Sequence, residues 1–367
     1  MIDNYIYTDN LSVGYDGVPL MKDICIQVKK GKIVTLIGPN GAGKSTILKT
    51  IIRQLKPVSG IVYLEGKPLG KMEDREIAKR LSVMMTERIQ PELMTCEDVV
   101  SMGRYPYTGR LGILSGEDKK KVQEALKLVH GLELSGRLFS ELSDGQRQRI
   151  LLARAVCQEP EAIVLDEPTS FLDIRHKLEL LSVLKELVTK KNVAVLMSLH
   201  ELDLAQKVSD YVVCVKGCFI EKMGTPEEIF TSEYISGLYG LTKGSYQAES
   251  GCLELEPVSG MPEVFVIGGN GTGIPVYRRL QRMGIPFAAG ILHENDRDYP
   301  VAQALAVKVV SEKPFFPVSD ETFMEAEVLM QSCKNVICTI DQFGPGNEKN
   351  RQLALAAGVL LTEKRES

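Results

Sequence analysis

A glycine-rich turn near the N-terminus has the residue types that bind phosphate groups. The run Gly38-Pro-Asn-Gly-Ala-Gly-Lys44-Ser45 fits the pattern G-x-x-x-x-G-K-[ST] at every fixed position. Its glycines let the backbone approach a phosphate, and the amides of the turn can donate hydrogen bonds to it. Lys44 can reach the outer phosphates of a nucleotide, and the Ser45 hydroxyl can ligate Mg²⁺. The predicted nucleotide-binding residues are Gly38, Pro39, Asn40, Gly41, Ala42, Gly43, Lys44, Ser45 and Thr46.

Two carboxylates after an apolar run can supply the rest of the chemistry. Asp166 and Glu167 directly follow the buried-strand pattern of residues 162–165. In nucleotide hydrolases, such an aspartate can hold Mg²⁺, and a neighbouring glutamate can orient or deprotonate the attacking water. A helix-capping acid is the alternative interpretation of an Asp-Glu pair. The phosphate-binding turn earlier in the chain favours the catalytic interpretation.

The elements around these residues alternate between strand and helix patterns. Residues 32–37 predict a buried strand before the glycine-rich turn, and residues 44–53 predict a helix after it. Residues 162–165 and 193–197 predict two further buried strands, with a helix over residues 175–188 between them. This alternation is typical of an α/β fold with a mostly parallel sheet.

The length and composition indicate two domains. At about 150 residues per domain, a chain of 367 residues is long enough for two. Residues 246–261 are rich in Gly, Ser, Glu and Pro and predict a linker between residues 1–245 and residues 262–367. The formal charge of −4 argues against a nucleic-acid-binding protein. No apolar run approaches the roughly 20 residues of a membrane-spanning helix, so we expect none.

A third motif makes the resemblance to a family specific. The run Leu142-Ser-Asp-Gly-Gln-Arg-Gln-Arg149 resembles the signature LSGGQxQR of ATP-binding cassette (ABC) ATPases, with Asp144 in place of one glycine. Residues 1–245 thus resemble the nucleotide-binding subunit of an ABC transporter. The resemblance implies a P-loop NTPase cassette with a RecA-like core, a helical subdomain and an antiparallel β part. It also implies that this motif binds the ATP held by a second copy of the chain, through Ser143, Asp144, Gly145 and Gln146.

Other positions match the family one by one. The run Ser170-Phe-Leu-Asp173 resembles the D-loop, which crosses the dimer interface in the family. His200 resembles the switch histidine that contacts the γ-phosphate, and with Glu167 it forms the predicted catalytic pair. Tyr15 resembles the aromatic residue that stacks on adenine. A structural histidine and a surface strand tyrosine are the alternatives for His200 and Tyr15.

The chain departs from the family at one metal-binding position. The family usually carries glutamine after the strand that residues 81–85 predict, and its amide helps to bind Mg²⁺. Here Thr86 stands at that position and Glu87 follows it. Thr86 can offer one oxygen to the metal, whereas Glu87 is longer and charged. The sequence leaves open which of the two replaces the glutamine.

A further run points to one branch of the family. Gly103-Arg-Tyr-Pro-Tyr107 resembles the corresponding segment in ATPases of importers for iron–siderophore complexes, haem and cobalamin. The resemblance implies a homodimer that uses ATP and Mg²⁺ and a separate integral-membrane permease, served by an extracytoplasmic substrate-binding protein. It places the chain in the cytoplasm, peripheral on the inner face of the cell membrane. A generic surface loop is the alternative interpretation of this run.

Two other functions are compatible with a cassette. An ABC ATPase acting on ribosomes or DNA is one, but the chain has a single phosphate-binding turn, a single signature and no basic run. The other is an ATPase gated by a small cytosolic ligand that the C-terminal domain senses.

The C-terminal part resembles a small Rossmann-like α/β domain. Residues 264–267 predict a strand, and the turn Gly268-Gly-Asn-Gly-Thr-Gly273 follows it as an imperfect match to G-x-G-x-x-G. Glu294 and Asp296 lie where a ribose-binding acid is expected. A ligand-binding regulatory domain, a structural or dimer-supporting domain and an enzyme are the three roles left open.

Overall fold

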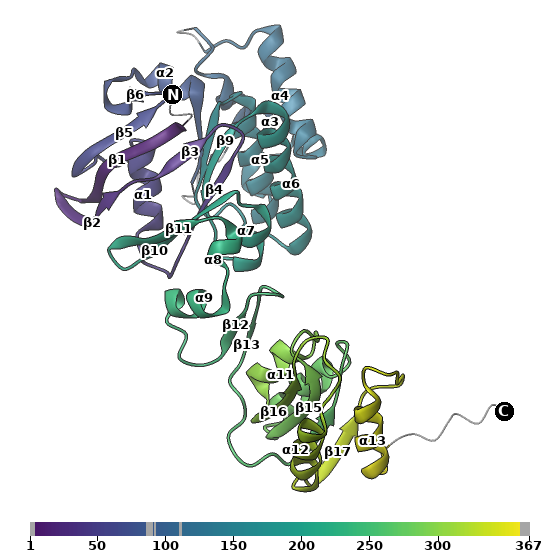
Figure 1. The fold of residues 1–367 in the computed structure, drawn as a ribbon. Helices are drawn as coiled ribbons and strands as arrows, with labels where there is room; N and C mark the ends of the chain where they lie inside the picture. The colour runs from purple at the N-terminus through teal and green to yellow at the C-terminus, as the bar shows by residue number, and fades with distance from the viewer. Residues whose placement is uncertain (1–3, 86–90, 92, 110–111, 360–367) are drawn as a thin grey trace. The chain divides into compact units, whose positions relative to one another are not determined.

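The computed structural model describes residues 4–85, 91, 93–109 and 112–359. The chain divides into two compact units, Met1–Phe230 and Thr231–Ser367 (Figure 1). Each unit has its own sheets and its own hydrophobic core, so each is described by itself.

A six-stranded sheet forms the centre of the first unit. Its strand order is β11-β10-β4-β9-β8-β7, and all neighbours are parallel except β10 and β11. β4 and β8 are buried at every position, which explains why their sequences are uninterrupted apolar runs. The predicted parallel arrangement is confirmed. The strands are β4 (Ile33–Ile37), β7 (Leu81–Met84), β8 (Ala162–Leu165), β9 (Ala194–Ser198), β10 (Tyr211–Lys216) and β11 (Phe219–Gly224).

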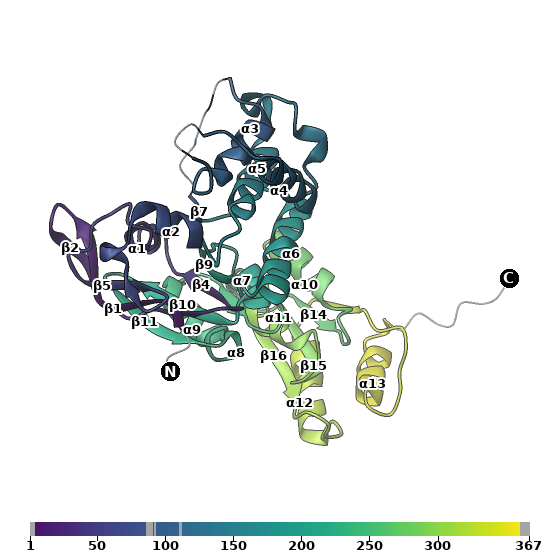
Figure 2. The ribbon, with the colours of Figure 1, turned by 90° about the horizontal axis from the view of Figure 1, so that it is seen from above.

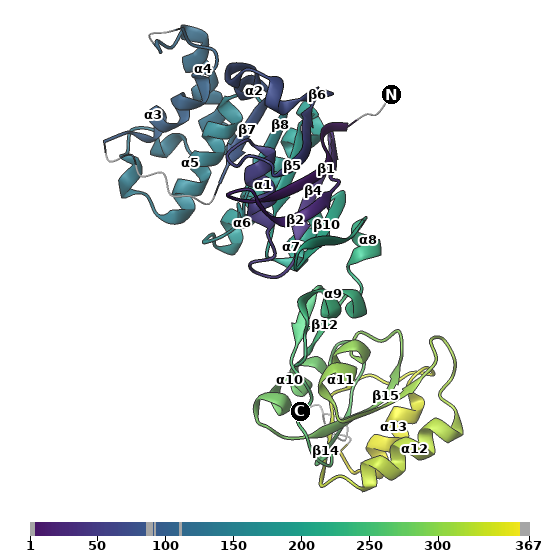
Figure 3. The same ribbon diagram turned by 90° about the vertical axis from the view of Figure 1, so that its left-hand side faces the viewer.

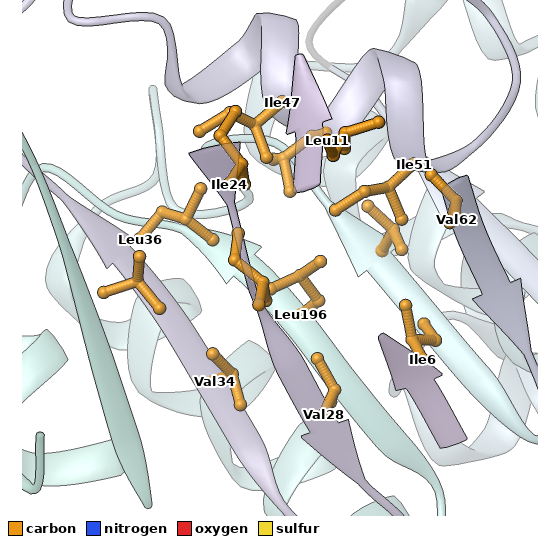
Figure 4. Packing of buried hydrophobic residues seen from close by; sticks show 14 of the residues in the cluster. Ile6, Leu11, Ile24, Val28, Val34, Leu36, Ile47, Ile51, Val62 and Leu196 are labelled. Carbon is orange, nitrogen blue, oxygen red and sulfur yellow. The ribbon is translucent and has the colours of Figure 1, made fainter. Parts of the chain in front are cut away.

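A second sheet of the first unit is antiparallel and contains the N-terminal strand. Its path is β2-β1-β5-β6, and β3 also pairs with β1. The bounds are β1 (Asn4–Tyr15), β2 (Val18–Ile24), β3 (Gln27–Lys29), β5 (Ser59–Leu64) and β6 (Lys67–Pro68). Helix α1 (Lys44–Ile51) contributes Ile47 and Ile51 to the core that this sheet shares with β4 and β9 (Figure 4). Burial of this core fixes the helix that carries Lys44.

The helices of the first unit fall into two sets. Helices α3, α4 and α5 lie together at one side of the unit (Figure 2). The set comprises α3 (Cys96–Ser101), α4 (Gly116–Leu128) and α5 (Asp144–Cys157), with short 3₁₀ turns η2 (Met102–Arg104), η3 (Leu132–Leu134) and η4 (Phe139–Glu141). The others are η1 (Leu69–Lys71), α2 (Asp74–Arg80), α6 (Ile174–Lys191), α7 (Leu202–Val208) and α8 (Pro226–Ile229).

The second unit begins with a helix and a hairpin. Helix α9 (Ser232–Tyr239) is followed by β12 (Ser245–Gln247) and β13 (Cys252–Glu254), which pair antiparallel. Part of the expected linker, residues 246–261, is therefore regular structure. The hairpin is held by a buried carboxylate, because Glu254 accepts a 3.1 Å hydrogen bond from Arg278 Nε. The domain bounds 1–245, 246–261 and 262–367 otherwise remain a prediction.

A parallel four-stranded sheet carries the rest of the second unit. Its order is β16-β15-β14-β17, with helices on both faces, as a Rossmann-like domain requires. Helices α10 and α11 cover one face and α12 and α13 the other (Figure 3). The elements are β14 (Val264–Ile267), α10 (Ile274–Arg282), β15 (Phe287–His293), α11 (Tyr299–Leu305), β16 (Lys308–Glu312), α12 (Asp320–Gln331), β17 (Asn335–Cys338) and α13 (Glu348–Ala356).

In the described part of the chain, none of the helices combines the length and apolar character that crossing a bilayer requires.

Candidate nucleotide site

The glycine-rich turn connects β4 to α1, as the sequence predicts. Gly38, at the end of β4, has φ 144°, and a Cβ added there would lie 2.0 Å from the carbonyl oxygen of Val215. Only glycine therefore fits at this position. Helix α1 has no side-chain cap at its N-terminus and no acidic residue in its first turn. Among the described residues, its first amides are thus left for an anion to bind.

Lys44 is held over this turn. The residue is 5% exposed, and its Nζ donates hydrogen bonds to the carbonyl oxygens of Gly38 at 2.7 Å and Pro39 at 3.0 Å. Burial lowers the pKa of the Lys44 ammonium, while the charges of Glu167 and Asp166 act in the opposite direction. A poorly solvated ammonium beside helix amides is suited to a phosphate ligand.

Ser45 and Asp166 meet although they come from distant parts of the sequence. The Ser45 hydroxyl donates to Asp166 Oδ1 at 3.1 Å, and Asp166 is 4% exposed. A hydroxyl and a carboxylate are the oxygen donors that Mg²⁺ prefers, so this pair fits that ion. The described residues contain no cluster of three or more His, Cys, Asp or Glu residues able to hold a metal. Mg²⁺ usually binds one or two protein oxygens, with phosphates and water completing its shell.

Glu167 and His200 are also brought together. Glu167 follows Asp166 with φ 48°, an uncommon conformation for a residue with a side chain. Its Oε1 contacts His200 Nε2, and its Oε2 accepts a hydrogen bond from Ser170 Oγ at 3.2 Å. His200 and Ser170 thus fix both oxygens of the carboxylate at the edge of the sheet where the phosphate-binding turn lies.

Ser198 is a residue of this site that the sequence reasoning missed. It ends β9 and is fully buried. Its Oγ donates to Asp166 Oδ1 at 2.7 Å and accepts from the backbone N–H of Glu167 at 2.9 Å. A single hydroxyl therefore ties the two acids to each other. The available signal was a polar residue ending an otherwise apolar strand, two positions before His200.

Tyr15 lies beside the first turn of α1. Its hydroxyl is 3.2 Å from Thr46 Oγ1, and the residue is 53% exposed at the end of β1. The ring is therefore open to a planar ligand at the edge of the phosphate-binding turn.

The signature and D-loop residues are occupied with capping their own helices. Ser143 and Gln146 form a capping box at the start of α5, where Asp144 also pairs with Arg147. Asp173 caps α6 and accepts from the backbone N–H of His176 at 2.9 Å. Gly145 lies in the first turn of α5, where an added Cβ would be in ordinary van der Waals contact with Leu172 at 3.5 Å. These contacts join the signature and D-loop residues to neighbours at the start of their own helices.

Thr86 and Glu87, the two candidates for the missing glutamine, lie outside the described residues.

Comparisons with known proteins agree with this arrangement. A family model described as "ABC transporter" matches residues 21–170, and a model of the "MJ0874 family" matches residues 287–367. A solved nucleotide-free ATP-binding cassette of an ABC transporter is similar over 64% of this chain and 94% of its own, with 25% identity and a TM-score of 0.55. The expected cassette fold is confirmed.

Three relatives define the family further. The ABC transporter ATP-binding protein MJ0873 of Methanocaldococcus jannaschii is 43% identical over 74% of this chain and 94% of its own. The iron(3+)-hydroxamate import ATP-binding protein of Bacillus subtilis is 38% identical over 64% of this chain and 88% of its own. The cobalamin import ATP-binding protein of Halobacterium salinarum is 30% identical over 86% of this chain and 81% of its own. The chain therefore belongs to the ATP-binding proteins of ABC transporters, and it is a transport ATPase.

Proposed function

We propose that this ATPase powers an importer of an iron–siderophore complex, haem or cobalamin through a separate membrane permease. The observation that carries the proposal is that relatives similar over 64–86% of the chain are named for such imports. The match to the cobalamin relative covers 86% of this chain, so it extends beyond residue 245 into the C-terminal part. Cobalamin is therefore our first choice of cargo. In this proposal two copies act as a homodimer, peripheral on the cytoplasmic face of the membrane. An extracytoplasmic binding protein delivers the cargo.

The first step of the proposed cycle is ATP binding. Lys44 and the amides at the start of α1 hold the outer phosphates, and the Tyr15 ring stacks on adenine. Mg²⁺ held by Ser45 and Asp166 would neutralise phosphate charge. The support for these roles is the buried position of Lys44 and the 3.1 Å hydrogen bond between Ser45 and Asp166.

Glu167 orients the attacking water and accepts its proton in the hydrolytic step. The support is the contact of its carboxylate with His200 and Ser170, which restrict where the two oxygens point. His200, which contacts this carboxylate, would sense the γ-phosphate. Residues at the start of α5 and of α6 would complete the nucleotide site of the second copy, because the N-terminus of a helix attracts anions. They are Ser143, Asp144, Gly145, Gln146 and Asp173.

Capture of the permease tests the importer proposal. The Glu167→Gln protein, loaded with ATP and Mg²⁺, is used to pull partners from detergent-solubilised membranes of its own host. We expect a polytopic permease in the eluate, and we expect proteoliposomes containing this permease and the wild-type chain to take up labelled cobalamin when ATP is supplied. Wild-type protein with ADP is the control. Ribosomal proteins or nucleic acid in place of a permease would contradict the proposal, and uptake of a ferric hydroxamate alone would change the cargo.

Removing the Ser198 hydroxyl should slow hydrolysis. In Ser198→Ala, the Glu167 amide loses its partner and Asp166 loses a hydrogen bond, at a cost of about 1–3 kcal/mol for the orphaned amide. We expect kcat to fall about tenfold or more and the Mg²⁺ requirement to rise, with a smaller change in KM for ATP. Steady-state phosphate release over a range of Mg²⁺ concentrations measures both.

Ser82 provides a matched control for Ser198. It is 1% exposed on β7, which is separated from β9 by β8 in the same sheet, and its hydroxyl has no hydrogen-bond partner among the described residues. Ser82→Ala should leave kcat and the Mg²⁺ dependence unchanged. An equal fall in kcat in the two variants would show that Ser198→Ala acts through core packing rather than through its hydrogen bonds to Asp166 and Glu167.

A further inference from the structure

A cavity of about 550 Å³ lies at the carboxyl edge of the parallel sheet in the second unit. It is lined from all four strands, for example by Asn270 after β14, Asp296 after β15, Phe316 after β16 and Gly346 after β17. Open α/β sheets bind ligands at this edge. The volume is also within the range of small-molecule sites, about 300–1,000 Å³.

One wall of the cavity presents two phenyl rings to solvent. Phe315 and Phe316 are 91% and 62% exposed, yet the loop that carries them is anchored at both ends. Glu312 accepts a 2.9 Å hydrogen bond from the backbone N–H of Ser319, and His293 Nε2 lies 2.8 Å from the Phe316 carbonyl oxygen. Phe315 has φ 67°, a left-handed conformation that bulky residues rarely adopt. A fixed, strained loop that exposes two aromatic rings is suited to stacking on a planar ligand.

Polar groups also line the cavity. Both oxygens of Asp296 accept from the backbone N–H of Asn270 at 2.9 Å, and Oδ1 also accepts from the backbone N–H of Asp298 at 2.8 Å. Oδ2 retains acceptor capacity for a ligand hydroxyl. Arg297 is exposed and makes no ion pair among the described residues. In nucleotide-binding sheets of this topology, an acid after the second strand binds ribose hydroxyls. β15 is the second strand here.

The glycine-rich turn, which binds the diphosphate in dinucleotide-binding sheets, is here occupied by the side chain of Asp298. Asp298 is fully buried and accepts hydrogen bonds from the backbone N–H groups of Gly273 at 2.8 Å and Ile274 at 3.3 Å. These are the first amides of α10, which would otherwise face a phosphate. A Cβ on Gly273 would lie 2.4 Å from the Tyr277 hydroxyl. The glycine therefore accommodates an internal tyrosine, whereas the first unit leaves the corresponding amides of α1 for its ligand.

We propose that this cavity binds a nucleoside, with its base against Phe315 and Phe316 and its ribose hydroxyls on Asp296, and without a diphosphate in the glycine-rich turn. The proposal depends on neither the transported cargo nor the catalytic roles assigned above. It gives the second unit a binding function that the cassette does not need for hydrolysis.

Calorimetric titration of the full chain with adenosine tests the proposal. The protein is first saturated with ADP and Mg²⁺, so that the cassette site is filled. We expect one further adenosine per chain, and at least about tenfold weaker binding in Phe316→Ala, in line with the contribution of one aromatic stack. Because the ring is exposed, this variant should unfold at the wild-type temperature. Phe219→Ala, which removes an exposed phenyl ring from β11, should bind adenosine normally.

A second pair of variants tests the ribose contact. Asp296→Asn should weaken adenosine binding. Glu294→Gln makes the same change of charge at the other acid that the sequence offered for ribose, but Glu294 is exposed and is not among the residues that line the cavity, so this variant should bind adenosine normally. The proposal fails if the ADP-loaded chain binds no adenosine, or if Phe316→Ala binds it as well as wild type. NAD⁺ binding more than tenfold tighter than adenosine would overturn the assignment of Asp298 as the occupant of the phosphate position.

Discussion

Replacing Glu167 with glutamine is expected to lower ATP turnover by about 10²–10⁴-fold, the usual contribution of a general base. Glutamine keeps the size of the side chain and can still contact His200 and Ser170. It cannot accept a proton from water at neutral pH, so ATP binding should persist while hydrolysis stops. Phosphate release, compared with equilibrium binding of ATP, separates these two effects.

The same variant should accumulate as an ATP-bound dimer. We propose further that the dimer opens only after hydrolysis. Light scattering of the variant with ATP and Mg²⁺ should therefore report twice the monomer mass. Glu161→Gln is the matched control. It alters a glutamate directly before the other end of β8, where the side chain forms a surface ion pair with Lys30. If Glu167→Gln hydrolysed ATP at the wild-type rate, Glu167 could not be the residue that accepts the proton of the attacking water.

Replacing Arg104 with alanine is expected to destabilise the first unit by about 3–5 kcal/mol, the usual result of breaking a buried ion pair from one side. The Arg104 side chain is 6% exposed and pairs with Asp118 and Glu159, each at 2.9 Å. It also donates to the carbonyl oxygen of Cys157 at 2.9 Å, which links η2 to the end of α5. Its loss should lower Tm by roughly 10 °C in calorimetry.

Arg175→Ala is the control for this loss of charge. Its side chain is 82% exposed and forms a surface pair with Glu179, so its removal should cost about 0.5 kcal/mol or less. A Tm shift of Arg104→Ala as small as that of Arg175→Ala would show that the buried network contributes little.

The same network predicts a pH dependence. Hydrogen bonds from Ser115, and then from Arg104, hold the pKa of Asp118 below its ordinary value of 3.8. A carboxylate with a depressed pKa stabilises the folded state above its unfolded pKa, and this contribution is lost as pH falls through the folded value. Wild-type stability should therefore drop below about pH 4. The stability of Arg104→Ala should fall less over the same pH interval, because this variant lacks the hydrogen bond from Arg104 that helps to lower the pKa of Asp118.

The local elements around the phosphate-binding turn could be predicted from the sequence. β4 and β8 are buried on both faces, which makes their sequences continuous apolar runs, and the glycine-rich turn between β4 and α1 has a fixed residue pattern. The antiparallel sheet of the first unit came only from the resemblance to the family. β16 and the β12–β13 hairpin were not predicted, because short, partly exposed strands leave little periodic signal.

The sequence by itself identified the motifs that consist of contiguous residues: the phosphate-binding turn, the acids after β8 and the signature. Only the tertiary structure revealed that Ser198 joins the two acids, that Arg104 is buried in an ion-pair network, and that Asp298 fills the second glycine-rich turn. These contacts join residues that are 24 or more positions apart, except for Arg104 and Asp118, which are 14 apart. Their energies come from burial and distance, which no local pattern of residue types records.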